Sequence, residues 1–158
     1  MVKSANLGYP RIGAKRELKK ALEAYWKGEI DAGALEAAGA DLRARNWAAQ
    51  AEAGIARFPS NDFSFYDQVL DTTAMLGAVP LRFAGLDGLE AYFAMARGTD
   101  AAAAMEMTKW FDTNYHYIVP ELTEGMTFRL ANDLPVQRFN EAQAQGLHTR
   151  PVLVGPVT

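Results

Sequence analysis

Two lysines and an arginine stand where a helix is predicted to begin, and together they form a candidate anion-binding site. Lys15 and Arg16 follow Gly13, and Lys19 lies one helical turn after Lys15. The first turn of a helix favours Asp and Glu, because its free backbone N–H groups carry partial positive charge. Two cations after a loop glycine therefore indicate an anionic ligand. The alternative is a solvated helix end, with Arg16 and Lys20 paired to nearby glutamates.

A lysine among aromatic side chains is the second candidate. Lys109 shares its segment with four aromatic residues: Trp110, Phe111, Tyr115 and Tyr117. A lysine can lay its methylene stem on an aromatic surface while its ammonium group stays at the mouth of a pocket. The same arrangement also occurs at the edge of an ordinary core. The residues alone leave both interpretations open.

The remaining residues do not indicate a metal or nucleotide site. The chain has no cysteine and two histidines, His116 and His148. A zinc site usually needs three or four suitable ligands, so His116 near Asp112 is interpreted as a hydrogen-bonded structural residue. Residues 8–13 have neither the glycine spacing of a dinucleotide loop nor the ending of a P-loop. We expect no metal ligands in this chain.

Composition narrows the class of protein further. The chain has 158 residues, of which 49% are hydrophobic, enough for one domain with a core. The formal net charge of -3 provides no broad basic field, so a nucleic-acid partner is not expected. No segment approaches the ~20 apolar residues that span a bilayer. We expect a soluble, cytoplasmic protein without a membrane partner.

Hydrophobic spacing, together with helix start and stop signals, predicts the helices and strands that position these candidate residues. Helices are predicted over 15–27, from a cap at Asp31 through Trp47 towards Ile55, and over 66–76, 86–97 and 134–145. Strands are predicted within 5–13 and 105–120, the latter with a functional loop, and over 128–130 and 151–155. This alternation is typical of an α/β fold built on parallel strands.

The same patterns predict which side chains are buried. Trp26, Trp47 and Leu153 are expected to be largely buried, because they lie on apolar stripes or in an apolar strand. Lys15, Arg16 and Lys19 are expected to remain accessible at one mouth of the fold. The sequence stops at Thr158 just after a predicted strand, where such folds carry their chemistry, so we expect it to be part of a larger protein.

Five segments, in this order and spacing, resemble cobalamin-independent methionine synthase. They lie at 7–13 (LGYPRIG), 16–28, 61–67 (NDFSFYD), 106–117 (EMTKWFDTNYHY) and 153–158. The resemblance covers essentially the whole chain. The proteins of this family are several times longer, so the chain resembles only their beginning.

The resemblance implies an enzyme that moves a methyl group from 5-methyltetrahydropteroyltri-L-glutamate to L-homocysteine, forming methionine without cobalamin. It implies two (β/α)8 barrels, with the zinc ligands and the homocysteine site in the C-terminal barrel. Residues 1–158 would be the helix-rich, incomplete N-terminal part of the first barrel. This part would carry no catalytic residue and would be inactive alone.

The resemblance also implies a role for the two cationic candidates. In the family, the basic turn and the lysine of the Met-Thr-Lys-Trp-Phe motif bind the folate substrate. The positions that match here are Lys15, Arg16, Glu17, Leu18, Lys19 and Lys109. A triglutamate tail offers several carboxylates to the cations at the helix start. The alternative is a free-standing anion-binding or interaction module descended from such a barrel.

Overall fold

The computed structural model describes residues 2–157, which form two compact units. The first unit contains the chain up to Phe65 together with Pro135–Leu153. The second unit contains Tyr66–Leu134 and the chain from Val154 onward. Helices and two small sheets make up the chain, which confirms the predicted α/β class.

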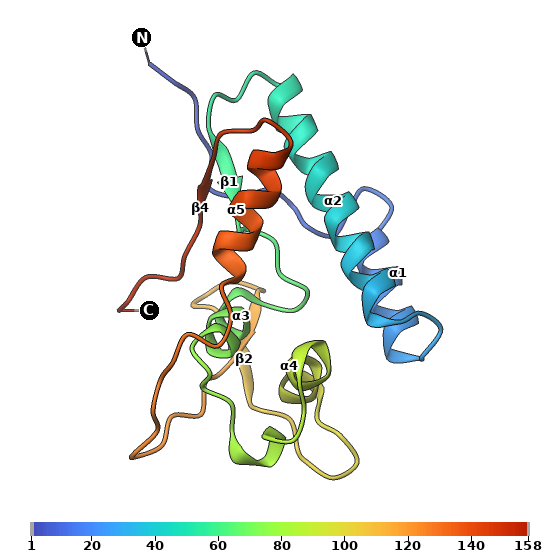
Figure 1. Ribbon diagram of the computed structural model, residues 1–158, viewed down its shortest axis with the longest axis vertical. Helices are drawn as coiled ribbons and strands as arrows, with labels where there is room; N and C mark the ends of the chain where they lie inside the picture. The colour runs from blue at the N-terminus through green and yellow to red at the C-terminus, as the bar shows by residue number, and fades with distance from the viewer. Residues whose placement is uncertain (1, 158) are drawn as a thin grey trace. The chain divides into compact units, whose positions relative to one another are not determined.

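Three helices belong to the first unit: α1 (Glu17–Trp26), α2 (Ala32–Glu52) and, from Pro135 on, α5 (Leu134–Ala144). All three were predicted within a few residues. The Asp31 carboxylate accepts a hydrogen bond of 2.8 Å from the amide of Ala34, which confirms the predicted N-cap of α2. Helix α1 lies along α2, and α5 lies beside α2 (Figure 1).

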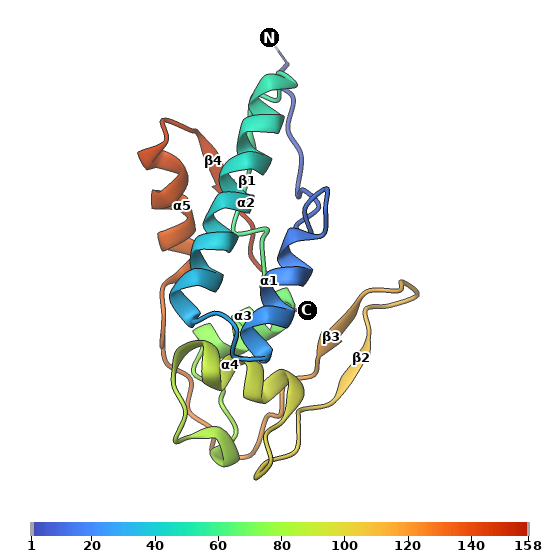
Figure 2. The ribbon, with the colours of Figure 1, turned by 90° about the vertical axis from the view of Figure 1, so that its right-hand side faces the viewer.

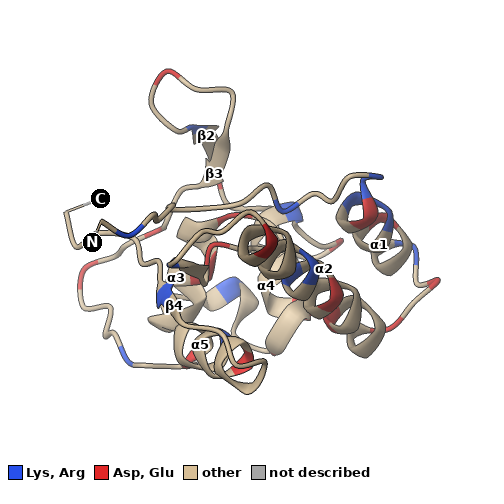
Figure 3. Cartoon of the chain, turned by 90° about the horizontal axis from the view of Figure 1, so that it is seen from above, with Lys and Arg blue, Asp and Glu red and all other residues tan. Residues whose placement is uncertain are grey.

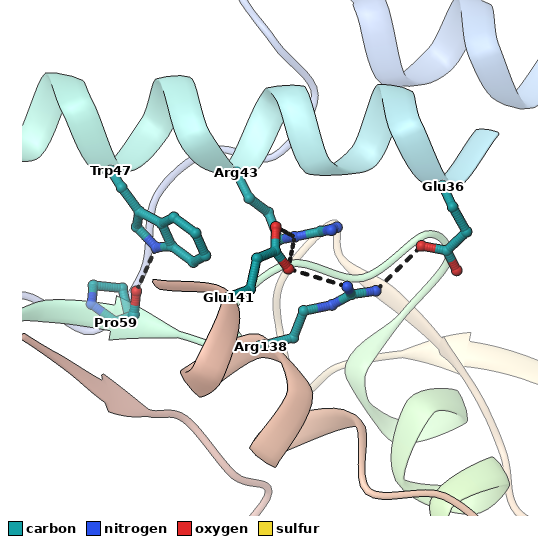
Figure 4. Close-up of polar contacts among 6 residues, drawn as sticks. All are labelled: Glu36, Arg43, Trp47, Pro59, Arg138 and Glu141. Atoms are coloured by element: carbon teal, nitrogen blue, oxygen red, sulfur yellow. Dashed lines mark hydrogen bonds and ion pairs between the residues drawn. The ribbon is translucent and has the colours of Figure 1, made fainter. Parts of the chain in front are cut away.

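The core of the first unit centres on Trp47 of α2, which is only 2% exposed, as predicted. Its ring packs against Phe58 and Ala142, and its Nε1 donates a 2.9 Å hydrogen bond to the carbonyl of Pro59 (Figure 4). This contact joins α2 to the strand that follows it. Trp26, by contrast, is half-buried, so the prediction for that residue was too strong.

A partly buried ion-pair network also connects α2 with α5 (Figure 4). Arg43 is 4% exposed, and its Nε lies 3.0 Å from both carboxylate oxygens of Glu141. Arg138 contacts the same carboxylate at 3.2 Å and Glu36 at 3.3 Å. Burial, and then the charge of Arg138, lower the pKa of Arg43 below its ordinary value, while Glu141 opposes that change.

A parallel strand pair completes the first unit. Strand β1 (Phe58–Ser60) pairs with β4 (Thr149–Pro151), with Phe58 opposite Thr149. Ala5 adds a single parallel bridge to Arg57, so the strand predicted within 5–13 is reduced to this contact. Parallel pairing agrees with the prediction, whereas β1 was not predicted because it has only three residues and contains a proline.

The predicted burial of the last strand is wrong. The register of β4 with β1 ends at Pro151, and Leu153 lies beyond it with 62% of its surface exposed. An apolar run indicates a buried strand only when another layer packs on it. Within the described residues, pairing stops before that run is covered.

The second unit contains α3 (Gln68–Met75), the 3-10 turn η1 (Leu81–Phe83), α4 (Gly88–Arg97), β2 (Met107–Lys109) and β3 (His116–Ile118). The two predicted helices are confirmed. Strands β2 and β3 form an antiparallel hairpin with Met107 opposite Ile118. Figure 2 shows this hairpin projecting from the helices α3 and α4 of its own unit.

The prediction of a strand over 128–130 is wrong. This segment is irregular. The amide of Arg129 within it donates to the carbonyl of Leu76 at 3.0 Å, and that of Ala131 just after it donates to the carbonyl of Met75 at 2.8 Å, at the end of α3. The exposed carbonyls at the end of α3 therefore satisfy amides that a sheet would otherwise pair. Across residues 2–157, no helix is long and apolar enough to cross a bilayer.

Candidate anion-binding site

The basic turn, residues 15–19, leads into α1 with an unusual backbone. Arg16 is the N-cap residue and adopts a left-handed conformation, with φ 61° and ψ 37°. A non-glycine residue in this region costs about 1–2 kcal/mol and is found where surrounding contacts enforce it, often at functional sites. Lys15, Arg16 and Lys19 are exposed, which confirms their predicted accessibility.

Backbone and core contacts hold this turn in place. The amide of Arg16 donates to the carbonyl of Gly13 at 3.0 Å, and that of Leu18 donates to Ile12 at 3.1 Å. Leu18 is 1% exposed, so its side chain belongs to the core and only its backbone is near the site. Gly13 has φ 82°, and a Cβ there would lie 2.9 Å from the side chain of Leu42 on α2. The turn therefore requires glycine at this position.

Glu17 contributes its carboxylate to the turn itself. One oxygen, Oε2, accepts from the amide of Lys15 at 2.8 Å, and the other, Oε1, accepts from Nη1 of Arg45 at 2.9 Å. Hydrogen bonding by its own backbone amide, then by Arg45 and then by the Lys15 amide, lowers the pKa of Glu17 from 4.5 to about 2. Glu17 is therefore ionised at neutral pH and directed into the turn.

The charges of the turn are only partly compensated. Lys19 pairs with Glu23 at 3.5 Å, with both side chains about half exposed. Within the described chain, Lys15 and Arg16 form no salt bridge, because Glu17 pairs with Arg45 instead. The pairs expected for a simple solvated helix end, Arg16 with Glu17 and Lys20 with Glu23, are therefore not the ones formed. Figure 3 shows cationic and anionic segments side by side at α1.

Lys109 lies in the second unit, at the end of β2, and its side chain is exposed. The next residue, Trp110, packs edge-to-face against Phe111 and Tyr117, with ring centroids 5.3 and 5.4 Å apart. A cavity of about 380 Å³ adjoins them, lined by Val69, Lys109, Trp110, Phe111, Tyr117, Pro120 and Val157. A cation thus stands beside an aromatic hollow, which is one of the two arrangements that the sequence left open.

The tip of the hairpin has its own hydrogen bonds. The amide of Trp110 donates to Tyr115 at 2.7 Å, and Phe111, with φ 51°, is 78% exposed. His116 Nδ1 lies 3.0 Å from the carbonyl oxygen of Asn114, so this histidine is hydrogen-bonded, as inferred. Over residues 2–157, no group of three or more His, Cys, Asp or Glu side chains is arranged to hold a metal ion.

The structure brings five of the predicted site residues, 15–19, together in one turn of the first unit, whereas Lys109 belongs to the second unit. Two residues that support these segments were not predicted. Arg45 is one of several charges on α2, and nothing in the local pattern relates it to Glu17. Asp67 is 1% exposed and accepts from the amides of Leu70 and Ile118 at 2.9 and 3.0 Å. The available signal was an aspartate at the start of the predicted helix 66–76, where a cap residue is common.

The fold and these segments define an α/β protein with a cationic turn at a helix start and a lysine beside an aromatic hairpin. Residues 3–158 match the family described as cobalamin-independent synthase, N-terminal domain, and the chain belongs to this family. The resemblance inferred from five short segments is confirmed.

Several curated relatives are similar along almost the whole chain. Proteins named 5-methyltetrahydropteroyltriglutamate–homocysteine methyltransferase from Flavobacterium johnsoniae and Mesorhizobium japonicum are 55% and 54% identical over 99% and 98% of this chain. The protein of the same name from Streptomyces coelicolor is 57% identical over 96% of it. The matched regions make up 21%, 23% and 20% of these relatives, so the chain spans about a fifth of their length.

Proposed function

We propose that this chain is the N-terminal part of an enzyme that transfers the methyl group of 5-methyltetrahydropteroyltri-L-glutamate to L-homocysteine, and that it binds the glutamate tail of the folate. Membership of the synthase family and the names of the relatives support the reaction. The observation that carries the tail-binding role is the pair of exposed cations, Lys15 and Arg16, which form no salt bridge within the described chain.

The electrostatics of the basic turn suit a polycarboxylate. A γ-linked triglutamate offers several carboxylates along a flexible chain, and cations spaced along one turn can pair with more than one of them. Hydrogen bonds between ionised partners are about twice as strong as neutral ones. The left-handed backbone at Arg16 is a local cost of the kind retained at ligand sites.

Lys109, which belongs to the second unit, is proposed as a further contact of the tail. Its ammonium group is exposed beside an aromatic hollow, so it can pair with a carboxylate while its stem packs on ring surface. We assign no catalytic residue to this chain.

We further propose that the first unit is the beginning of a (β/α)8 barrel. In such barrels, parallel strands carry helices on their outer face. Here β1 and β4 are parallel, and Phe58 of β1 packs against Trp47 of α2 and Ala142 of α5. The helices thus cover one face of the pair, which is the arrangement that the proposal requires.

Zinc chemistry does not fit the residues of this chain. The sequence has no cysteine, and residues 2–157 contain no cluster of three potential ligands. We therefore propose that zinc and homocysteine bind to parts of the enzyme that lie outside this sequence. We propose that this methyl transfer between two small metabolites takes place in the cytoplasm.

The test is an amide NMR titration of the chain with mono- and triglutamyl 5-methyltetrahydrofolate at low and high salt. We expect the amides of 15–19 and of Lys109 to shift, with tighter binding of the triglutamyl form that weakens with salt, since exposed charges are screened over ~8–10 Å. Arg16→Ala or Lys109→Ala should cost roughly 1–3 kcal/mol of triglutamyl binding.

Arg57→Ala is the matched control, because Arg57 is an exposed cation of the first unit outside the basic turn. It should leave both affinities unchanged. Equal losses for mono- and triglutamyl ligands in the Arg16 and Lys109 variants would refute the tail-binding role.

A further inference from the structure

A carboxylate lies within the proposed carboxylate-binding site. Glu17 follows Lys15 and Arg16 directly, and its charge would oppose the binding of an anionic tail. The side chain is 29% exposed, so protein contacts screen it only in part. A basic turn that binds an anion therefore needs an interaction that directs this carboxylate inward and compensates its charge.

Helix α2 supplies such an interaction. Arg45 donates from Nη1 to Oε1 of Glu17 at 2.9 Å, across 28 positions of sequence. One helical turn earlier on α2, Leu42 stands against Gly13 at the start of the same loop. Two side chains of α2 thus contact this segment, Leu42 at Gly13 through an apolar contact and Arg45 at Glu17 through a charge.

We propose that Arg45 is a positioning residue for the tail site, acting through Glu17 and not by contact with the ligand. This inference rests on the proposed function of the basic turn. Arg45 holds Oε1, which leaves Oε2 to accept the amide of Lys15 at 2.8 Å, and the resulting bridge fixes the loop in which Arg16 adopts its left-handed conformation.

The space above Gly13 supports this assignment of roles. A Cβ at Gly13 would lie only 2.3 Å from Oε2 of Glu17, so the carboxylate occupies the position that a larger residue would need. The carboxylate is thereby turned towards the loop backbone. Glu17 is thus a structural member of the site, and the ligand contacts of the basic turn fall to Lys15, Arg16 and Lys19.

The charge balance leads to the same assignment. With Arg45 present, the Glu17 charge is compensated from outside the turn, so the charges of Lys15 and Arg16 remain available to a ligand. Without Arg45, the carboxylate would instead attract these two neighbours and reduce the positive potential that the tail encounters.

The experiment compares Arg45→Ala, Arg45→Lys and Glu17→Gln with the unmodified chain in the same titration with triglutamyl 5-methyltetrahydrofolate. We expect Arg45→Ala to weaken binding about three- to tenfold, and Arg45→Lys, which retains the charge, to restore part of the loss. Arg45 is 57% exposed, so Arg45→Ala should leave the thermal unfolding midpoint nearly unchanged. The Lys15 amide resonance should move even without ligand.

A double variant separates positioning from direct contact. If Arg45 acts through Glu17, Arg45→Ala should cause little further loss in a Glu17→Gln background. Full additivity of the two losses would overturn the inference, as would unchanged binding by Arg45→Ala while the unmodified chain prefers the triglutamyl ligand. Absence of that preference in the unmodified chain would instead refute the proposed function itself.

Discussion

The basic turn and the β2–β3 hairpin both present an exposed lysine, but the protein holds them in different ways. The turn rests on buried side chains, with Leu18 1% exposed directly within it. The hairpin projects from its unit and ends in Phe111, which is 78% exposed (Figure 2). The base of the hairpin is held by Ile118, which is fully buried and whose amide donates a hydrogen bond to the carboxylate of Asp67.

This difference has a consequence for how substitutions act. In the turn, the same few residues determine stability and charge position, so changes there should affect folding and binding together. At the hairpin tip, the side chains pack mainly on one another, so changes there should affect binding with little effect on folding. The four predictions below test this separation.

The largest effect on stability is expected from Glu141→Ala. Glu141 belongs to the ion-pair network that joins α5 to α2, the helix that supports the basic turn. Removing this carboxylate leaves Arg43 and Arg138 without their shared partner in a largely buried position, which should destabilise the chain by about 3–5 kcal/mol. Urea unfolding followed by circular dichroism measures the change. Glu29→Ala, which removes an exposed pair with Lys27, is the control and should cost less than about 0.5 kcal/mol.

The stabilities of the Leu18→Ala and Phe111→Ala variants test directly how the basic turn and the hairpin tip differ. Truncating the buried leucine should cost about 2–5 kcal/mol, because it removes core contacts and leaves a cavity. Truncating the exposed phenylalanine should change the free energy of unfolding by no more than about 0.5 kcal/mol. Urea unfolding measures both changes. Similar losses of unfolding free energy in the two variants would show that the hairpin tip is part of a core, as the turn is.

The base of the hairpin should respond to Asp67→Ala. This change leaves the buried amides of Leu70 and Ile118 without their acceptor, which should cost about 1–3 kcal/mol. Amide hydrogen exchange should become faster at Ile118. Asp31→Ala removes an exposed helix cap in the first unit and should leave exchange at Ile118 unchanged. Unchanged exchange in the Asp67 variant would mean that other contacts hold the hairpin.

The smallest effect is the pH dependence of the turn. The folded-state pKa of Glu17, about 2, lies below its ordinary value of 4.5, so its contribution to stability is complete above pH 4.5 and is lost as the pH falls towards 2. The side-chain carboxyl carbon, followed by NMR, should therefore titrate near 2. In Arg45→Ala the pKa should rise, because a hydrogen-bond donor to the ionised form is lost. A midpoint near 4.5 in the unmodified chain would contradict the bridged geometry.

The sequence alone determined the features that depend on a few neighbouring residues. The start of α2 at Asp31, the ends of α1 and α3 near Gly28 and Gly77, and the accessibility of the basic turn all follow from caps, glycines and hydrophobic spacing. The family follows from short motifs whose order and spacing can be read directly. These signals are local, so they survive without knowledge of the tertiary contacts.

Only the tertiary structure decided the features that join distant parts of the chain. The pairing of β1 with β4 joins residues about 90 positions apart, and the bridge from Arg45 to Glu17 spans 28. The two short strands have no distinctive local sequence pattern, and neither has an arginine on the surface of a helix. The exposure of Leu153 likewise depends on where pairing ends, not on the apolar character of its neighbours. Hydrophobicity favours burial, but tertiary packing decides which apolar side chains find a covering layer and which charges meet a partner.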